Sequence, residues 1–417
     1  MKKFLSIVAL EMKAIVRSGM LAALCAVSVL WMLASPFLLK GDGTAQGARE
    51  LYVRFSLGGV FVFVAIVLIA AATGSVARER AAKRLQLTLV RPVGRFSVAL
   101  GKVISLSLSG AAVLLVSSLV LLAKTDPSVR CDRIVSPVLP SPAEEASAMY
   151  ETFMNDPSTP PEVKRAKKSV VMRLLTQRAV DHYQTVPTND SVRWSFRIPS
   201  AGALSVRMRF TNQFDMRQDV LGRFVYDGKT VAVSNITQAI LKVPLDSRAR
   251  LSGDGAAQEL EFFNLGKTAL MLRPRKDLHL LISADSFCRN LARAWLELSA
   301  ILTLLVAFGV FLSSGLGRPV AMFVALAVLL SGEVSPSVIS QYPDELETKT
   351  VDRIGLYLTR FSAEVTRPFS SLSPLQSLSR DECVEMEEVL RVLLVNCIAV
   401  PLVFCLLAAY LMPRKQD

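Results

Sequence analysis

The sequence predicts a membrane all-α bundle of six transmembrane helices with an inserted extracytoplasmic α+β domain that contains an antiparallel β-sandwich. Three observations support this fold class. The chain is 52% hydrophobic and has a mean hydropathy of +0.41, yet 20% of its residues are charged. These charges lie between long apolar runs, as they do in proteins with several membrane spans. Between residues 124 and 289 the apolar runs give way to a polar segment that is long enough to form its own domain.

Residues 1–17 predict an amphipathic helix at the cytoplasmic membrane interface. Its apolar residues recur at helical spacing on one face and its cations lie elsewhere: Phe4, Val8, Met12 and Ile15 against Lys2, Lys3, Lys13 and Arg17. The first span then runs from about Met20 to Leu39. A cleaved signal peptide is the alternative, but charges interrupt its apolar stretch and no clear small-residue cleavage site follows.

Residues 18–123 hold the first three spans, with a basic loop, 77–102, between the second and the third. Span two, Phe55–Val76, and span three, Val103–Leu122, contain no charged residue. Each is about 20 residues long, enough to cross a hydrocarbon core of about 30 Å. The loop carries one acid, Glu79, among seven cations: Arg78, Arg80, Lys83, Arg84, Arg91, Arg95 and Lys102. Short loops rich in lysine and arginine stay in the cytoplasm, so this loop predicts the orientation of the chain.

Residues 124–289 predict an extracytoplasmic domain with two parts. Residues 140–185 favour helices, whereas apolar and polar residues alternate between 190 and 286, as they do on strands with one buried face. Trp194 shares such a face with Phe196 and Ile198, so we expect it in the core of a β-sandwich.

Two cysteines flank this predicted domain. Cys131 follows the third span and Cys288 precedes the fourth, so the two ends of the domain should emerge close together. We predict that they pair in an oxidising compartment, with Cys383 as the alternative partner.

Residues 290–413 hold spans four to six and an outer amphipathic segment, 340–386. Span four is Leu296–Leu312, and span six is Val389–Leu411. With six crossings, both termini lie in the cytoplasm, and the basic residues after span six agree with that placement.

Span five is the least regular of the six. It starts at Val320, and its apolar run stops before Glu333, so the helix either continues to about Ile339 or dips into the bilayer and returns. A carboxylate at that depth is a functional-site candidate, although Glu333 is more simply placed at the outer membrane interface.

The sequence argues against several classes of function. Two histidines and six cysteines without a CxxC pair form no recognisable zinc site. Two Gly-Lys-Thr triplets, 228–230 and 266–268, lack the earlier glycine of a phosphate-binding loop. The net charge of +13 comes without basic stretches interleaved with aromatic residues, so we expect no nucleic acid partner. We therefore expect no catalytic, cofactor-binding or metal site in this chain.

The basic loop has an ordered pattern. An acid is followed by a leucine-rich turn, then by Pro-Val-x-Arg, then by Gly-Lys at the start of span three: Glu79; Leu85, Leu87 and Leu89; Pro92, Val93 and Arg95; Gly101 and Lys102. This pattern resembles the corresponding loop of type-2 ABC transporter permeases, especially those of the gliding-motility and copper-enzyme-maturation type. The chain departs from that loop at Lys83 and Arg84, where Gly-Thr is usual. The N-terminal helix and the six spans are also similar to the family, whereas residues 124–289 lie outside the resemblance.

The resemblance implies the permease subunit of an ABC transporter, which couples ATP hydrolysis by a separate ATPase subunit to export or to mechanical work. ATP is then bound by that partner and not by this chain. In such a protein the loop docks in a groove of the ATPase, with Leu85 and Leu87 as apolar anchors and with Glu79 and Arg84 setting the register. The predicted coupling residues are Glu79, Arg84, Leu85, Leu87, Pro92, Arg95 and Lys102. The family's pathway runs between two sets of spans, which implies a homodimer or a pair with a similar permease in the bilayer.

Two alternatives remain open at the level of sequence. In the first alternative, the basic loop only sets the orientation of the chain in the membrane and binds no partner. The whole chain is also explained as a membrane-anchored adhesion or sensory protein whose β-sandwich binds a ligand in the cell envelope. A neighbouring gene for an ABC ATPase would favour the transporter.

Overall fold

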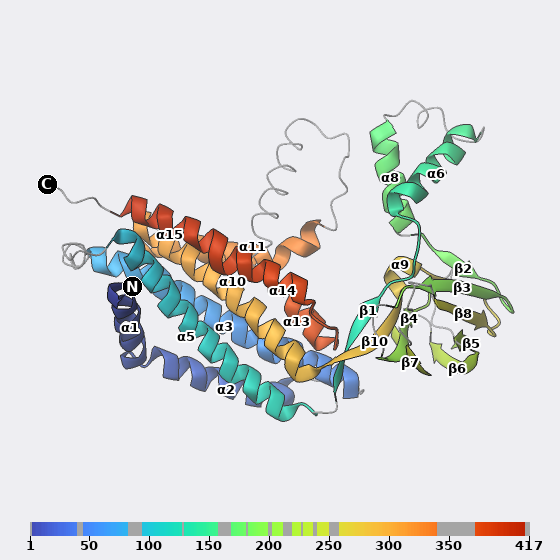
Figure 1. The fold of residues 1–417 in the computed structure, drawn as a ribbon, viewed down its shortest axis with the longest axis horizontal. Coiled ribbons are helices and arrows are strands. Elements are labelled where there is room, and N and C mark those ends of the chain that lie inside the picture. The colour runs from blue at the N-terminus through green and yellow to red at the C-terminus, as the bar shows by residue number, and fades with distance from the viewer. Residues whose placement is uncertain are drawn as a thin grey trace. The chain divides into compact units, whose positions relative to one another are not determined.

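The computed structural model describes residues 2–39, 45–81, 94–126, 129–156, 168–180, 182–198, 202–211, 219–226, 228–236, 240–249, 258–339 and 372–412. The chain divides into two compact units (Figure 1). One is a helical unit made of Met1–Val129 and Ser286–Asp417, and the other is a β-rich unit, Arg130–Asp285.

Among its described residues, the helical unit is built from ten segments, most of them long α-helices. In chain order they are α1 (Lys2–Arg17), α2 (Met20–Leu38), α3 (Ala45–Ala81), α5 (Arg95–Lys124), α10 (Phe287–Gly315), α11 (Arg318–Ile339), α13 (Leu372–Ser379), α14 (Met386–Leu393), the π-helix η2 (Leu394–Ala399) and α15 (Val400–Leu411). The segments α14, η2 and α15 follow one another without a break and form one long helical stretch.

Within the described residues, five stretches are long and apolar enough to cross a membrane. They are Met20–Leu38, Gly47–Ala77, Arg95–Lys124, Phe287–Gly315 and Met386–Leu411. They coincide with predicted spans one to four and six, so the helical membrane bundle is confirmed for these five.

The fifth predicted span corresponds to α11. This helix continues past Glu333 to Ile339, the first of the two alternatives drawn from the sequence. Its apolar part, Arg318–Gly332, is shorter than the other five stretches, so a sixth crossing stays a prediction. The side chain of Glu333 and most of the predicted amphipathic segment, 340–371, lie outside the described residues.

Helix α10 forms the centre of the helical unit. It packs against α3, α5 and α15 (Figure 1), and 72% of its membrane-length window is buried. Glycines permit this close packing, because a Cβ atom at Gly309 would lie 2.9 Å from the Cβ of Ala72, and one at Gly110 would lie 2.5 Å from Leu68. Small residues let helix backbones approach each other where lipid offers no hydrophobic driving force between helices.

The β-rich unit contains ten strands and three helices among its described residues. The strands are β1 (Arg130–Val135), β2 (Gln184–Val186), β3 (Ser191–Phe196), β4 (Gly202–Arg209), β5 (Asp219–Tyr226), β6 (Lys229–Ile236), β7 (Ile240–Ala249), β8 (Gln258–Asn264), β9 (Leu270–Leu272) and β10 (Leu278–Ser286). The helices are α6 (Pro142–Asn155), α8 (Lys168–Val180) and the short α9 (Pro274–Asp277).

These strands form two four-stranded sheets, ordered β1-β10-β4-β7 and β3-β8-β5-β6, and a two-stranded sheet of β2 and β9. The registered pairs are antiparallel; for example, Trp194 lies opposite Leu260 and Val206 opposite Leu280. The inward-facing residues of all three sheets share one hydrophobic core, which contains Trp194, Phe224 and Phe262. The arrangement fits the predicted β-sandwich, and Trp194 is buried as expected.

The sheets extend beyond the predicted sandwich boundaries of 190–286. Strand β1 precedes the helical part and pairs with β10, while β2 has three residues, too few to show an alternating pattern. Helix α6 begins at a capping box in which Ser141 and Glu144 exchange hydrogen bonds. The backbone N–H of Ser141 donates to Glu144 and holds the pKa of this carboxyl below its ordinary value.

We predict that two identical substitutions on α3 and α10 differ in their effect on stability. Gly309→Ala should destabilise the protein by about 1–3 kcal/mol, because the new methyl group meets Ala72, which has no flexible side chain to move aside. Gly58→Ala is the matched control: its Cβ would lie 3.4 Å from Leu375, an ordinary contact, so helix propensity should make it neutral or slightly stabilising. Thermal unfolding of the two variants in detergent measures the difference, and equal midpoints would contradict the packing described here.

Candidate functional site

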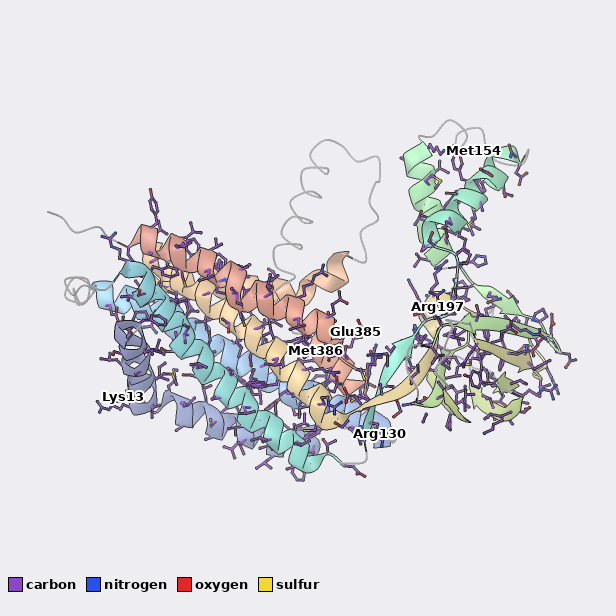
Figure 2. All side chains as sticks on the ribbon, in the orientation of Figure 1. Lys13, Arg130, Met154, Arg197, Glu385 and Met386 are labelled. Carbon is purple, nitrogen blue, oxygen red and sulfur yellow. The ribbon has the colours of Figure 1, made fainter. Side chains whose placement is uncertain are left out.

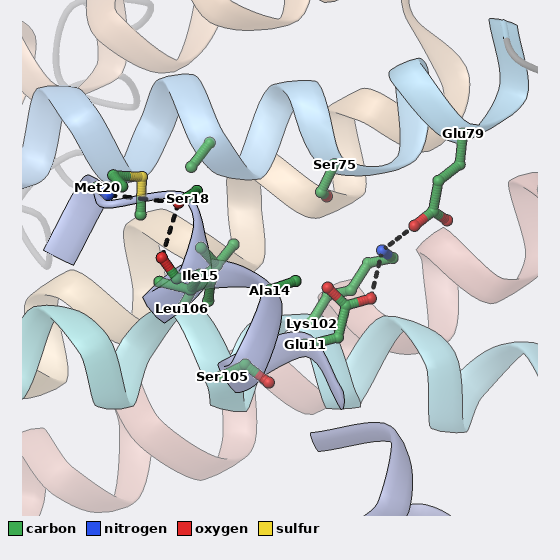
Figure 3. A pocket seen from close by; sticks show the side chains of 11 residues that line it. Glu11, Ala14, Ile15, Ser18, Met20, Ser75, Glu79, Lys102, Ser105 and Leu106 are labelled. Atoms are coloured by element: carbon green, nitrogen blue, oxygen red, sulfur yellow. Dashed lines mark hydrogen bonds and ion pairs between the residues drawn. The ribbon is translucent and has the colours of Figure 1, made fainter. Parts of the chain in front are cut away.

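A buried lysine lies where α1, α3 and α5 meet. The ammonium of Lys102, on α5, donates hydrogen bonds to Glu11 Oε1 of α1 at 2.8 Å and to Glu79 Oε1 of α3 at 2.6 Å (Figure 3). The lysine side chain is 2% exposed, whereas those of Glu11 and Glu79 are 25% and 29% exposed. We call these three residues the charge cluster.

The surrounding helix packing holds the charge cluster together. A Cβ atom at Gly101 would lie 2.9 Å from a methyl carbon of Ile7, so α1 and α5 touch directly beside the lysine. One turn further along α5, the hydroxyl of Ser105 donates to the backbone carbonyl of Val8 at 3.3 Å. The side of α1 that faces α5 therefore brings Glu11 to the lysine.

The electrostatics of the charge cluster explain why all three members are needed. An ammonium removed from water costs several kcal/mol unless opposite charges and hydrogen bonds compensate it. Two carboxylates supply that compensation, and they leave the cluster with a formal charge of −1. The second oxygen of Glu79, Oε2, is buried and has no hydrogen-bond partner among the described residues.

The charge cluster borders a cavity of about 610 Å³. Its polar lining consists of Glu11, Ser18, Ser75, Glu79, Lys102 and Ser105 (Figure 3). The three serine hydroxyls all donate to backbone carbonyls of their own or neighbouring helices. The cavity therefore lies between α1 and the long helices, at the end of α3 where the basic loop begins.

The structure places three of the predicted coupling residues. Glu79 lies in the last turn of α3 and Lys102 lies two turns into α5, so the predicted loop 77–102 is helical at both ends. Arg95 is the first residue of α5, and its guanidinium donates to the carbonyl of Met412 at 3.4 Å, apart from the charge cluster. The other predicted coupling residues, Arg84, Leu85, Leu87 and Pro92, lie outside the described residues.

The charge cluster gives Glu79 an ion-pair partner within the chain, Lys102. The role of Glu79 in setting the register of the loop on a partner stays a prediction. Glu11 was missed altogether. The signal was present, because an acid at position 11 lies on the same helical face as Val8 and Ile15 and so needs a basic partner there.

A buried acid on α10 is another residue that the sequence patterns did not single out. Glu297, on α10, is 3% exposed, and its Oε1 has no hydrogen-bond partner among the described residues. Carboxylates inside membrane spans are rare, and they are functional-site candidates by default.

The two flanking cysteines do not form a disulfide in the structure. Cys131 is buried in β1 and Cys288 is exposed at the start of α10. The two chain ends do meet as predicted, since the N–H of Phe287 donates to the carbonyl of Val129 at 3.4 Å. The pairing of Cys131 with Cys288 under oxidising conditions stays a prediction.

Residues 5–136 match the family model described as ABC-2 family transporter protein. The match supports an ABC-2 type permease. The matched region contains most of α1 and all of α2, α3 and α5, and thus every member of the charge cluster. Proteins of this family are membrane components of ABC transporters, are generally not enzymes themselves and in general partner with an ABC ATPase. Together with the apolar helices, the match indicates a multi-pass membrane protein. No curated protein and no solved structure matches the chain.

We predict that Lys102→Met destabilises the protein by about 2–4 kcal/mol, because it leaves two partly buried carboxylates side by side without a counter-charge. Glu11→Gln should cost less, about 1–3 kcal/mol, because Glu79 alone compensates the buried ammonium only in part. Replacing all three charges at once, with Met at 102 and Gln at 11 and 79, should recover most of the loss. Thermal unfolding in detergent compares the variants; a Lys102→Met protein as stable as the wild type would refute the compensation argument.

Proposed function

We propose that this chain is the permease subunit of an ABC transporter, in which the segment from Glu79 to Lys102 couples a separate ATPase to the transmembrane helices. The family match over residues 5–136 carries the proposal. The finer subtype, gliding-motility and copper-enzyme-maturation permeases, rests on the pattern of Glu79, Pro92, Arg95 and the Gly101-Lys102 pair.

The charge cluster supports a mechanical role for this segment. Residues 82–94 connect the end of α3 to the start of α5, so a force on them acts on both helices. Because Lys102 binds Glu11 as well as Glu79, α1 is connected to the same point. Helix α10 packs on α3 and α5, so their displacement is passed into the centre of the helical unit. Packed helices shift as rigid bodies, which is how a local movement becomes a change of state.

The proposal includes a partner arrangement and an orientation. One chain supplies one set of spans, so we propose a homodimer or a pair with a similar permease. The chain then lies in the cytoplasmic membrane with both termini and the coupling segment in the cytoplasm, and the β-rich unit lies outside the cell membrane. The rival function, a membrane-anchored adhesion or sensory protein, is favoured only by the β-rich unit, which lies largely beyond the matched residues.

We predict opposite sides of the membrane for two reporter fusions, one after Ser200 and one after Lys415. Positive residues between spans two and three keep that loop in the cytoplasm, and an even number of crossings returns the C-terminus there. Alkaline phosphatase and fluorescent-protein fusions measure the two sides. If both fusions report the same side, α11 does not cross and the chain has five spans.

Substitution of the apolar residues in the coupling segment tests whether this segment binds the ATPase. Leu85→Asp combined with Leu87→Asp should abolish co-purification of the ATPase, because burying a carboxylate in a protein groove costs several kcal/mol. Arg91→Gln is the control and should have little effect, since an exposed ion pair contributes about 0–1 kcal/mol. Both proteins are compared at matched expression in the membrane. Retention of the ATPase by the double variant would mean that the segment is only topogenic.

A further inference from the structure

The two sides of helix α1 have different surroundings. Its inner side packs on α5 at Ile7 and Val8 and supplies Glu11 to the charge cluster. Its outer side exposes three apolar side chains, with Leu5 58%, Leu10 65% and Val16 57% exposed. This outer side is therefore exposed to the surroundings of the protein.

The charges of α1 are also sorted between its two sides. Glu11 is the only acid in the helix, and Lys102 binds it on the inner side. Lys13 and Arg17 are exposed on the outer side, and neither has an ion-pair partner among the described residues. Figure 2 shows the Lys13 side chain pointing away from the helices of the unit. The outer side thus combines exposed apolar residues with cations whose charge is not compensated.

The position of α1 in the chain limits what can cover this side. A sharp turn at Gly19, which has a φ of +71°, separates α1 from the membrane-length helix α2, which begins at Met20. The outer side therefore lies within a few residues of the bilayer surface. A basic amphipathic helix at that level buries its apolar residues between lipid chains and places its cations among the headgroups.

We propose that the outer side of α1, formed by Leu5, Leu10, Lys13, Val16 and Arg17, binds the headgroups of anionic phospholipids. The proposal rests on the membrane placement in the proposed function but not on the ATPase. Lys102 has a positioning role in it, because its bond to Glu11 turns the acid of α1 away from the lipid. The exposed charged residues on the outer side of α1 are the cations Lys13 and Arg17.

The test uses the full-length chain in detergent, titrated with phosphatidylglycerol or with phosphatidylcholine and followed by native mass spectrometry. The wild type should bind phosphatidylglycerol more tightly than phosphatidylcholine. Lys13→Gln with Arg17→Gln should weaken phosphatidylglycerol binding by roughly fivefold for each cation removed and leave phosphatidylcholine binding unchanged. The preference should also fall at high ionic strength.

Two further measurements locate the site. The control variant, Arg178→Gln with Lys267→Gln, removes two exposed cations of the β-rich unit and should bind phosphatidylglycerol like the wild type. Hydrogen exchange in nanodiscs should show slower exchange of residues 2–19 when phosphatidylglycerol is present, and the Lys13/Arg17 double variant should lose that protection.

The proposal is overturned if the wild type shows no preference for phosphatidylglycerol or if the Lys13/Arg17 variant keeps the wild-type affinity. It is also overturned if the control variant loses as much phosphatidylglycerol affinity as the Lys13/Arg17 variant. Failure of the ATPase proposal gives a different pattern. The Leu85/Leu87 variant keeps both cations of α1, so it should bind phosphatidylglycerol normally whether or not it retains the ATPase.

Discussion

The helical unit depends on how one ammonium group is kept out of water. Lys102 is almost fully buried, and a single carboxylate at a partly exposed position would compensate it poorly. The charge needs both Glu11 and Glu79, which belong to different helices, so α1 and the end of α3 must meet at the same point on α5. The position of the N-terminal helix, the shape of the adjacent cavity and the geometry at both ends of the proposed coupling segment follow from that requirement.

Close backbone packing extends this constraint through the rest of the unit. Gly101 lets α1 approach α5, Gly110 lies against α3 and α10, and Gly309 lets α10 approach α3. A core with so little free space does not deform gradually, so a displacement at one end of α3 or α5 must be accommodated by a shift of whole helices. This is the property that a permease driven by an external ATPase requires, and it links the charge cluster to α10, the helix with the most buried membrane-length window.

The β-rich unit has its own core and is inserted without separating the helices around it. Its core is formed by residues of three sheets, with Phe224 and Phe262 among those fully buried. The chain leaves α5 and re-enters α10 at adjacent points, where Phe287 is hydrogen-bonded to Val129. Domains whose ends lie close together are readily inserted between two elements of another fold. The packing of α5 on α10 can therefore be the same as in a chain without the insertion.

Composition and periodicity alone were enough to predict the apolar spans, the change to alternating strands after residue 190 and the burial of Trp194. These features depend on local patterns of apolar and polar residues. The membership of the charge cluster was decided only by the tertiary structure. Glu11 and Lys102 are 91 positions apart, and nothing in the local sequence says that the two helices meet. For the same reason the local sequence did not show that Glu79 pairs with Lys102, or that β1 joins its sheet from outside the predicted sandwich. A local pattern shows which residues need a partner, but the packing of distant elements decides which partner they find.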